Sequence, residues 1–172
     1  MTTEAIVIVQ YDAGWPRVAA AEGRRLAAAV PSFVSVEHIG STAVPGLAAK
    51  PIVDLMPLVG TDAHLDQCVV PLLGLGYDYV PEYEDELPER RFFRLKRADG
   101  TGFNLHVVAR DGAFCRDHLA FRDALRGDPA LAARYERLKR DLAPRFADVN
   151  DYADAKGAFV RETLGRLGRE PA

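Results

Sequence analysis

The stretch that decides the fold is His38-Ile-Gly-Ser-Thr-Ala-Val-Pro-Gly-Leu-Ala-Ala-Lys-Pro-Ile-Val-Asp54. Residues 34–39 before and within it alternate in the manner of a β-strand, with His38 on the same side as Val36. Small residues follow from Gly40 to Gly46, and residues 52–59 are apolar on both faces, which is typical of a buried central strand. The stretch therefore predicts two strands joined by a glycine-rich loop, with Asp54 on the second strand.

This loop has the chemistry of a phosphate site. Gly40 lets a ligand approach the backbone, and the N–H groups and hydroxyls of Ser41 and Thr42 suit a phosphate. Asp54 could hold a metal that a nucleotide brings with it, and Lys50 adds a positive charge nearby. Neither a GxxxxGK[ST] loop nor a GxGxxG loop is present. The alternative is a structural Gly-Pro loop in which Ser41 satisfies backbone groups and Asp54 caps something.

The rest of the chain alternates between helix and strand signals. We expect a mixed sheet flanked by helices with a helical C-terminal third, an α/β (α+β) fold that forms a single domain over residues 1–172. The expected elements are a helix from Pro16 to about Ala29 capped by Asp12, a helix from Asp62 to about Leu73, a short strand at 77–80, a loop at 81–88, strands at 91–97 and 103–109 joined by Asp99-Gly100, and helices from Phe114, after Asp128-Pro129 and after Asn150-Asp151.

Composition limits the functions that the chain can have. The net charge of −3 and the pI of about 5.8 give no general attraction to nucleic acid or to anionic membranes. No secretory signal and no apolar run long enough to span a bilayer are visible, so we expect a cytoplasmic protein without a membrane partner. Cys68 and Cys115 stand alone and are expected to be reduced thiols.

Three polar side chains on the predicted strands could form a reactive group. His38, Asp54 and His106 lie among mostly apolar neighbours on strands that flank the loop. They could hold one divalent ion, with Asp54 and His106 as metal ligands, or act as an acid–base pair in which Asp54 orients a histidine. The alternative is that each histidine is a hydrogen-bonded structural residue.

Arginines begin the strand that follows the acidic loop. Alternation places Arg90 and Arg91 on different faces, and we expect Arg91 to grip a phosphate or carboxylate in the pocket. A register slip of one residue would exchange the two arginines. A solvated edge strand is the alternative.

The motif at 38–54 resembles the signature of the GrpB family, which is also catalogued as an uncharacterised protein family. Similarity continues through Pro88–Phe93, Asn104-Leu-His-Val-Val, His118-Leu-Ala-Phe-Arg-Asp and Tyr152–Phe159. The family resembles the DNA polymerase β-type nucleotidyltransferases in fold and is also found fused to dephospho-CoA kinase. The resemblance implies that His118, Arg122 and Lys156 also contribute to ligand binding.

The chain departs from the nucleotidyltransferase pattern at the metal site. That superfamily follows its Gly-Ser with Asp-x-Asp and a third carboxylate on a later strand, whereas here Met56 stands at the second position. The strand at 103–109 offers Asn104 and His106 but no carboxylate. A two-metal site needs several acidic ligands, so the resemblance favours the fold and a nucleotide pocket over nucleotidyl transfer.

Two functions follow. The first is a divergent nucleotidyltransferase-fold enzyme that binds a nucleotide or another phosphorylated small molecule and transfers a group with the help of Mg²⁺, Mn²⁺ or Zn²⁺. The second is a non-catalytic module that binds a nucleotide or a CoA precursor. A nucleic-acid binder ranks last, because acidic residues interleave the basic ones of the C-terminal helices.

Overall fold

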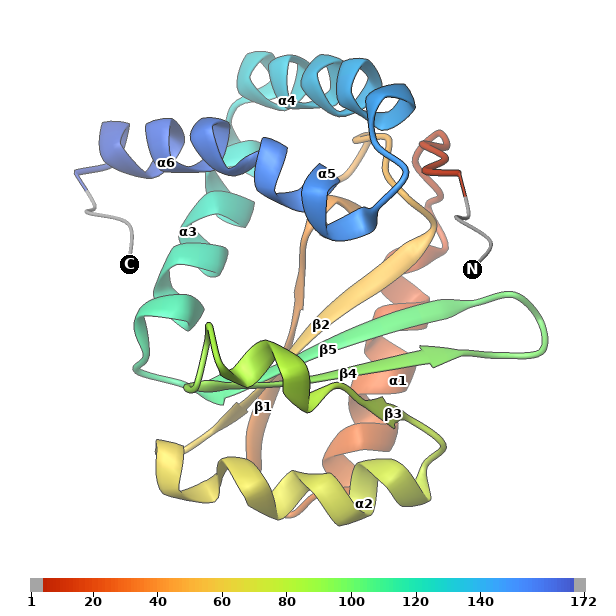
Figure 1. Cartoon of the computed structure of the whole chain (residues 1–172), viewed down its shortest axis with the longest axis vertical. Helices are drawn as coiled ribbons and strands as arrows, with labels where there is room; N and C mark the ends of the chain where they lie inside the picture. The colour runs from red at the N-terminus through yellow and green to blue at the C-terminus, as the bar shows by residue number, and fades with distance from the viewer. Residues whose placement is uncertain (1–4, 169–172) are drawn as a thin grey trace.

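A five-stranded mixed sheet forms the centre of the molecule (Figure 1). The computed structural model describes residues 5–168. The α-helices are α1 (Trp15–Ala29), α2 (Val69–Gly74), α3 (Ala113–Gly127), α4 (Pro129–Leu142), α5 (Val149–Ala155) and α6 (Gly157–Arg166). The strands are β1 (Phe33–Ile39), β2 (Ile52–Val59), β3 (Asp78–Tyr79), β4 (Arg90–Lys96) and β5 (Gly102–Ala109). Short 3-10 helices lie at Ser41–Ala43, Asp62–Cys68, Pro81–Glu84 and Ala143–Arg145.

The sheet has the strand order β1-β2-β5-β4-β3. Strand β2 pairs antiparallel with β1 and parallel with β5, while β4 pairs antiparallel with both β5 and β3. The central position of β2 explains its continuous apolar sequence, because both of its faces are covered. Ile39 lies opposite Asp54, and Asp54 lies opposite Asn104. These two register pairs determine which polar side chains meet.

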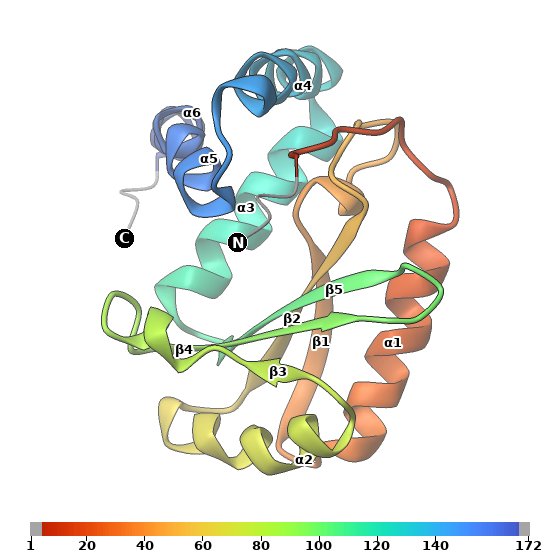
Figure 2. The same cartoon turned by 45° about the vertical axis from the view of Figure 1, so that its right-hand side comes forward.

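Helices cover the two faces of the sheet differently. The main core packs α1, α2 and the 3-10 helix at Asp62–Cys68 onto the face that carries Leu55, Leu105 and Phe93. A smaller cluster packs α3 onto the other face, through Met56 and Cys115. Figure 2 shows α3 to α6 gathered on the side opposite α1. A third cluster joins α3, α4 and α6 to the loop that follows β1.

The expected α/β architecture is confirmed, and most of its elements begin and end close to their predicted residues. The strand predicted at 52–59 has those bounds, and the strand at 103–109 begins one residue earlier. Asp128 caps α4 as expected, with its carboxylate accepting from the N–H groups of Ala130 and Leu131. Both cysteines are free and buried. No helix among the described residues is long and apolar enough to cross a membrane.

Three helical predictions are wrong in detail. Gly14 caps α1, while Asp12 accepts a hydrogen bond from the Gly14 N–H one turn earlier. The segment from Asp62 begins as a 3-10 helix and becomes α-helical only at Val69. The last predicted helix is two helices, because the chain turns at Lys156 after α5, which Asp148 caps. That turn places Lys156 beside the sheet.

Candidate functional site

The register of the sheet places Asp54, Asn104 and His106 on one face, the face covered by α3. Asp54 lies directly opposite Asn104 on β5, and His106 follows two residues later on the same side of that strand. The Asn104 Nδ2 donates to Asp54 Oδ1 over 3.1 Å, and His106 Nε2 lies 3.5 Å from the same oxygen. The side chain of Asp54 remains 29% exposed. The carboxylate is therefore oriented by two neighbours and still open to a ligand.

Gly40 fits against this carboxylate as no other residue would. Its φ of +73° lies in the region that favours glycine, and a Cβ added there would approach Asp54 Oδ2 to 2.8 Å. The backbone at the start of the loop therefore lies directly beside the acid. From the sequence we expected a ligand to approach the backbone at Gly40; in the structure the side chain of Asp54 takes that place.

Asp54 stays ionised in this setting. Burial opposes the charged form, but the hydrogen bonds from His106 and Asn104 and the charge of Lys50 outweigh it, so the pKa of Asp54 is lowered. Arg90 places Nη1 3.4 Å from His106 Nδ1. A guanidinium can only donate, so this arrangement assigns the proton of a neutral His106 to Nε2, facing Asp54. Asp54 and Arg90 thus contact the two ring nitrogens of His106, one on each side of the ring.

Aromatic rings surround the guanidinium of Arg90. Its Cζ lies 5.7 Å from the centre of the Tyr83 ring, 5.1 Å from that of Phe92 and 5.6 Å from that of Phe114. Arg94 lies over the Tyr83 and Phe92 rings and donates from Nη2 to Tyr83 Oη over 2.5 Å. The rings thus hold two guanidinium groups on the face that carries Asp54.

Lysines gather on the other side of Asp54. Lys156 Nζ lies 4.2 Å and Lys50 Nζ 5.7 Å from the centre of the Tyr152 ring. Burial, followed by repulsion from Lys50, lowers the pKa of Lys156 to about 8. Burial also lowers the pKa of Lys50, although the charge of Asp54 opposes that shift. The two ammonium groups and the carboxylate therefore influence one another directly.

A third lysine ties the loop to α4. Lys139 is 2% exposed, and its Nζ donates to Ser41 Oγ over 2.9 Å and to the carbonyl oxygen of Ala48. Burial, followed by repulsion from Lys156, lowers the pKa of Lys139 to about 7. We call Lys50, Lys139 and Lys156 the lysine group. Of the two predicted loop hydroxyls, Ser41 therefore meets this group, whereas the buried Thr42 meets His38.

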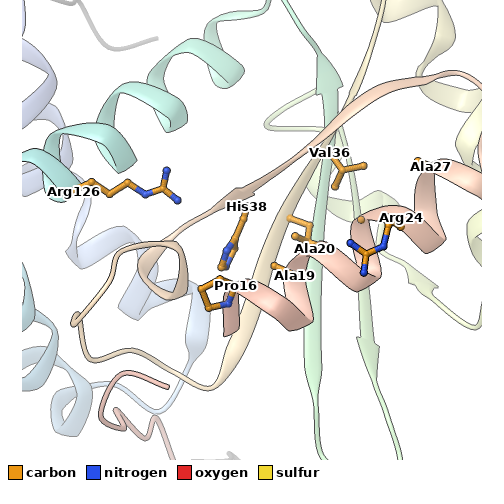
Figure 3. Close-up of a pocket in the computed structure, with 10 residues that line it drawn as sticks. Pro16, Ala19, Ala20, Arg24, Ala27, Val36, His38 and Arg126 are labelled. Atoms are coloured by element: carbon orange, nitrogen blue, oxygen red, sulfur yellow. The ribbon is translucent and has the colours of Figure 1, made fainter. Parts of the chain in front are cut away.

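The structure does not bring His38 to Asp54 and His106. Because Ile39 lies opposite Asp54, its neighbour His38 points to the other face, toward α1. There it lines a hollow of about 450 Å³ together with Pro16 and Arg126 (Figure 3). His38 Nε2 lies 2.8 Å from Thr42 Oγ1, and burial lowers the pKa of His38 to about 4. The expectation that His38 joins this group is wrong, because the pairing of β1 with β2 places it on the opposite face.

Arg91 is also on the wrong face for the expected role. It pairs through Nε with Asp66 over 2.7 Å and through Nη1 with Glu84 over 3.5 Å. Arg90, which alternation places on the opposite side of β4, reaches the His106 face instead. The registers of β4 and β5 thus settle the alternative that the sequence left open, in favour of Arg90.

The residues that the family resemblance added lie around the site in different ways. His118 stacks on Phe114 with ring centres 3.8 Å apart, and its ring centre is 6.3 Å from that of His106. Its Nδ1 lies 2.9 Å from the Phe114 carbonyl oxygen, and burial lowers the pKa of His118 to about 4. Arg122 is held by Glu37 and Asp123, each at 2.8 Å. Of these residues, Lys156 is the cation that has no carboxylate within ion-pair distance among residues 5–168, whereas Arg122 is paired.

The donor set does not fit a two-metal centre. Among residues 5–168 there is no group of three or more His, Cys, Asp and Glu side chains that could hold a metal ion. Met56, where a second aspartate would stand, is buried in the cluster beneath α3. Asp54 and His106 remain as two donors for a single ion, and that metal site stays a prediction.

Sequence reasoning missed Lys139. The residue looked like a surface lysine because α4 alternates basic and acidic residues, yet its position in the helix is buried. A lysine that repeats the helical spacing of the apolar residues Tyr135 and Leu142 was the signal that could have revealed it.

Comparisons with known proteins agree over nearly the whole chain. The family described as GrpB protein matches residues 5–166. A UPF0157 protein of Streptomyces coelicolor (SCO7215) is 39% identical over 164 residues, which cover 95% of this chain and 84% of the relative. A dephospho-CoA kinase of Mycolicibacterium paratuberculosis is 30% identical over 184 residues, covering 92% of this chain and 45% of that protein.

Solved structures point to the same family. The conserved protein GrpB from Enterococcus faecalis has a TM-score of 0.78 and 32% identity, covering 95% of this chain and 100% of that chain. A cytoplasmic RNA terminal U-transferase has a TM-score of 0.45 and 11% identity over 80% of this chain and 44% of its own, a partial likeness that says nothing of activity. From its sequence matches and its fold, the chain belongs to the GrpB family.

Proposed function

We propose that this protein binds a phosphorylated small molecule, with a nucleotide as the leading class, between the lysine group and Asp54. One observation carries the proposal. Among residues 5–168, no carboxylate lies within ion-pair distance of any of five cations around Asp54: Lys50, Arg90, Arg94, Lys139 and Lys156.

Arg94 is exposed, but for the other four cations, which are partly or fully buried, such an arrangement is costly in a protein without a ligand. Charges that fold into a partly buried site are normally paired, because the lost hydration must be replaced. Here the lowered pKa values of Lys139, about 7, and Lys156, about 8, reflect that penalty directly. A polyanionic ligand would supply the missing counter-charge. Phosphate groups meet this need with several oxygen acceptors and up to two charges each.

The loop adds a hydroxyl to the lysines. Ser41 Oγ accepts from the buried Lys139, so the lysine of α4 orients a loop hydroxyl whose own O–H remains a donor. The missing side chain of Gly40 lets the carboxylate of Asp54 lie directly against the start of the loop. These features favour a phosphate at the loop rather than a neutral ligand.

Asp54 is the group that would act on such a ligand. It is ionised, partly exposed and oriented by Asn104 and His106. In a transfer reaction, Asp54 would take the proton of an acceptor hydroxyl while the oxygen of this hydroxyl attacks the phosphorus. The bond from the phosphorus to the leaving oxygen would break, and the electron pair of this bond would go to the leaving oxygen. The competing function is binding without transfer, which the lone carboxylate favours over metal-assisted nucleotidyl transfer.

A thermal-shift screen tests the proposal. Nucleoside mono-, di- and triphosphates, dephospho-CoA and other CoA precursors are each added with and without Mg²⁺, Mn²⁺ and Zn²⁺. The matching region in a dephospho-CoA kinase is the reason for including the CoA precursors. A ligand at about a hundred times its Kd adds about 2.7 kcal/mol to stability, which raises the Tm of a domain of this size by about 5–10 °C.

Three variants are needed to interpret the screen. Lys156→Met should remove the shift, whereas Arg137→Met, which deletes an exposed charge from α4, should retain it. Asp54→Asn separates the two functions, because it abolishes turnover in an enzyme and keeps binding in a module. The proposal fails if no phosphorylated compound shifts the Tm, or if Lys156→Met leaves the shift unchanged.

A further inference from the structure

We propose that Arg90 forms a second oxyanion subsite, distinct from the lysine group, on the far side of Asp54 and His106. The inference rests on the proposed function for its first anion site and adds a second. A ligand would then carry two anionic groups, or two anionic ligands would bind on either side of the Asp54–His106 pair.

The first argument is that Arg90 lacks an ion-pair partner and a hydrogen-bond partner for its Nε among residues 5–168. Glu86 and Glu89 influence its charge from a distance, but neither lies within ion-pair distance, and burial lowers the pKa of Arg90. Its Nε is buried and has no hydrogen-bond partner, one of two such side-chain atoms among the described residues. Buried donors in folded proteins are nearly always satisfied. An acceptor oxygen brought by a ligand would complete this group.

The second argument is the way in which the surrounding aromatic rings hold the guanidinium of Arg90. The Tyr83, Phe92 and Phe114 rings fix the guanidinium, and among residues 5–168 its one side-chain hydrogen bond is the 3.4 Å contact with His106. Ring faces attract a cation, but they leave the in-plane N–H donors of a guanidinium unused. Those donors form a planar fork that matches a carboxylate or a phosphate. The protein thus holds Arg90 in place while occupying only the Nη1 donor that faces His106.

The third argument is distance along the sheet. Arg94 pairs with Asn104 and Arg90 with Val108 in the β4–β5 register. At a rise of about 3.3 Å per residue, these positions are about 13 Å apart along the strand. Lys50 influences Asp54 and is influenced by Arg94, which places the lysine group near the Asn104 end. His106 lies between the two ends, and neither Lys50 nor Lys156 is among the groups whose charge shifts the pKa of Arg90, so we treat the two ends as separate positions for an anion.

Arginine side-chain NMR tests this subsite directly. In ¹⁵N-labelled protein of 18.9 kDa, the Nε–H signal of Arg90 is identified by its loss in Arg90→Lys. Inorganic phosphate and, separately, acetate are titrated into the wild type and into Lys156→Met. Arg94→Lys serves as the control for a neighbouring guanidinium, and the backbone amide spectrum of each variant checks that it is folded. If Lys156→Met does not fold, Lys50→Met replaces it.

We expect a saturable shift of the Arg90 Nε–H signal in the wild type that persists when the lysine group is weakened. A shift with phosphate alone assigns a phosphate group to the subsite, acetate alone assigns a carboxylate, and both assign any oxyanion. No shift with either anion overturns the proposal, and so does a shift that disappears in Lys156→Met, because the two sites would then be one. If Arg90 responds while the amides of Ser41 and Lys50 do not, the proposed phosphate site at the lysine group fails and the Arg90 subsite stands.

Discussion

Replacing Gly40 with alanine tests the contact on which the site depends. The residue has φ +73° and ψ −171°, a conformation that costs a non-glycine residue about 1–3 kcal/mol. The new methyl group would also lie 2.8 Å from Asp54 Oδ2, closer than carbon and oxygen approach in ordinary packing. Asp54 cannot turn away freely, because Asn104 and His106 contact its other oxygen. Both effects reduce the free energy of unfolding.

Gly46→Ala is the matched control for this experiment. Gly46 also has a positive φ, +81°, but a Cβ there meets nothing within 4 Å. Gly40→Ala should therefore lower the Tm by about 2–10 °C and by more than Gly46→Ala does. In an Asp54→Ala background the 2.8 Å contact with Oδ2 is absent and only Cβ, at 3.3 Å, stays close, so Gly40→Ala should cost less than in the wild type. The coupling between the two positions should be about 0.5–3 kcal/mol, measured by urea unfolding.

The cycle can also refute the reasoning. If Gly40→Ala and Gly46→Ala cost the same, or if the cost of Gly40→Ala does not depend on Asp54, the loop backbone does not lie against the carboxylate. The phosphate corner proposed beside Asp54 would then lose its geometric basis.

Four further predictions concern charge. Burial lowers the pKa of Lys139 to about 7 and that of Lys156 to about 8, so between those values and the ordinary lysine pKa of 10.5 the unfolded chain binds more protons than the folded protein. The Tm in the absence of anions should therefore include a contribution that rises with pH across that window. Lys156→Met should flatten this rise. Sulfate, whose charge is constant there, should bind more weakly at pH 9 than at pH 6.5 by calorimetry, and equal affinities would contradict the role of these lysines. Asp54→Asn removes the one carboxylate that repels an anion beside Lys50 and should tighten sulfate binding; weaker binding would contradict this placement of the acid. Arg91→Gln should leave sulfate affinity unchanged and lower stability by only about 1 kcal/mol, because its partner Asp66 is largely exposed; a clear loss of affinity would return Arg91 to the site.

Local sequence signals were sufficient for most of the elements. The apolar run at 52–59 predicted the central strand, and Asp128-Pro129 predicted the start of α4, because an N-cap and a proline act on the residues next to them. The break at Lys156 was missed although Gly157 follows it, because Tyr152, Ala155 and Phe159 continue a helical spacing across it. The single-domain assignment over residues 1–172 remains a prediction.

The sequence by itself determined that Gly40, Ser41 and Asp54 belong to one loop–strand unit, since residues adjacent in the chain stay adjacent in the fold. It could not determine which side chains on different strands share a face. That depends on register, and a shift of one residue moves a side chain to the opposite side of the sheet. The pairing of Ile39 with Asp54 excluded His38, and the pairing of β4 with β5 chose Arg90 over Arg91. Long-range packing of α4 and α5 brought Lys139 and Lys156 to the loop, and only the tertiary structure could decide that, because it depends on contacts between residues about a hundred positions apart.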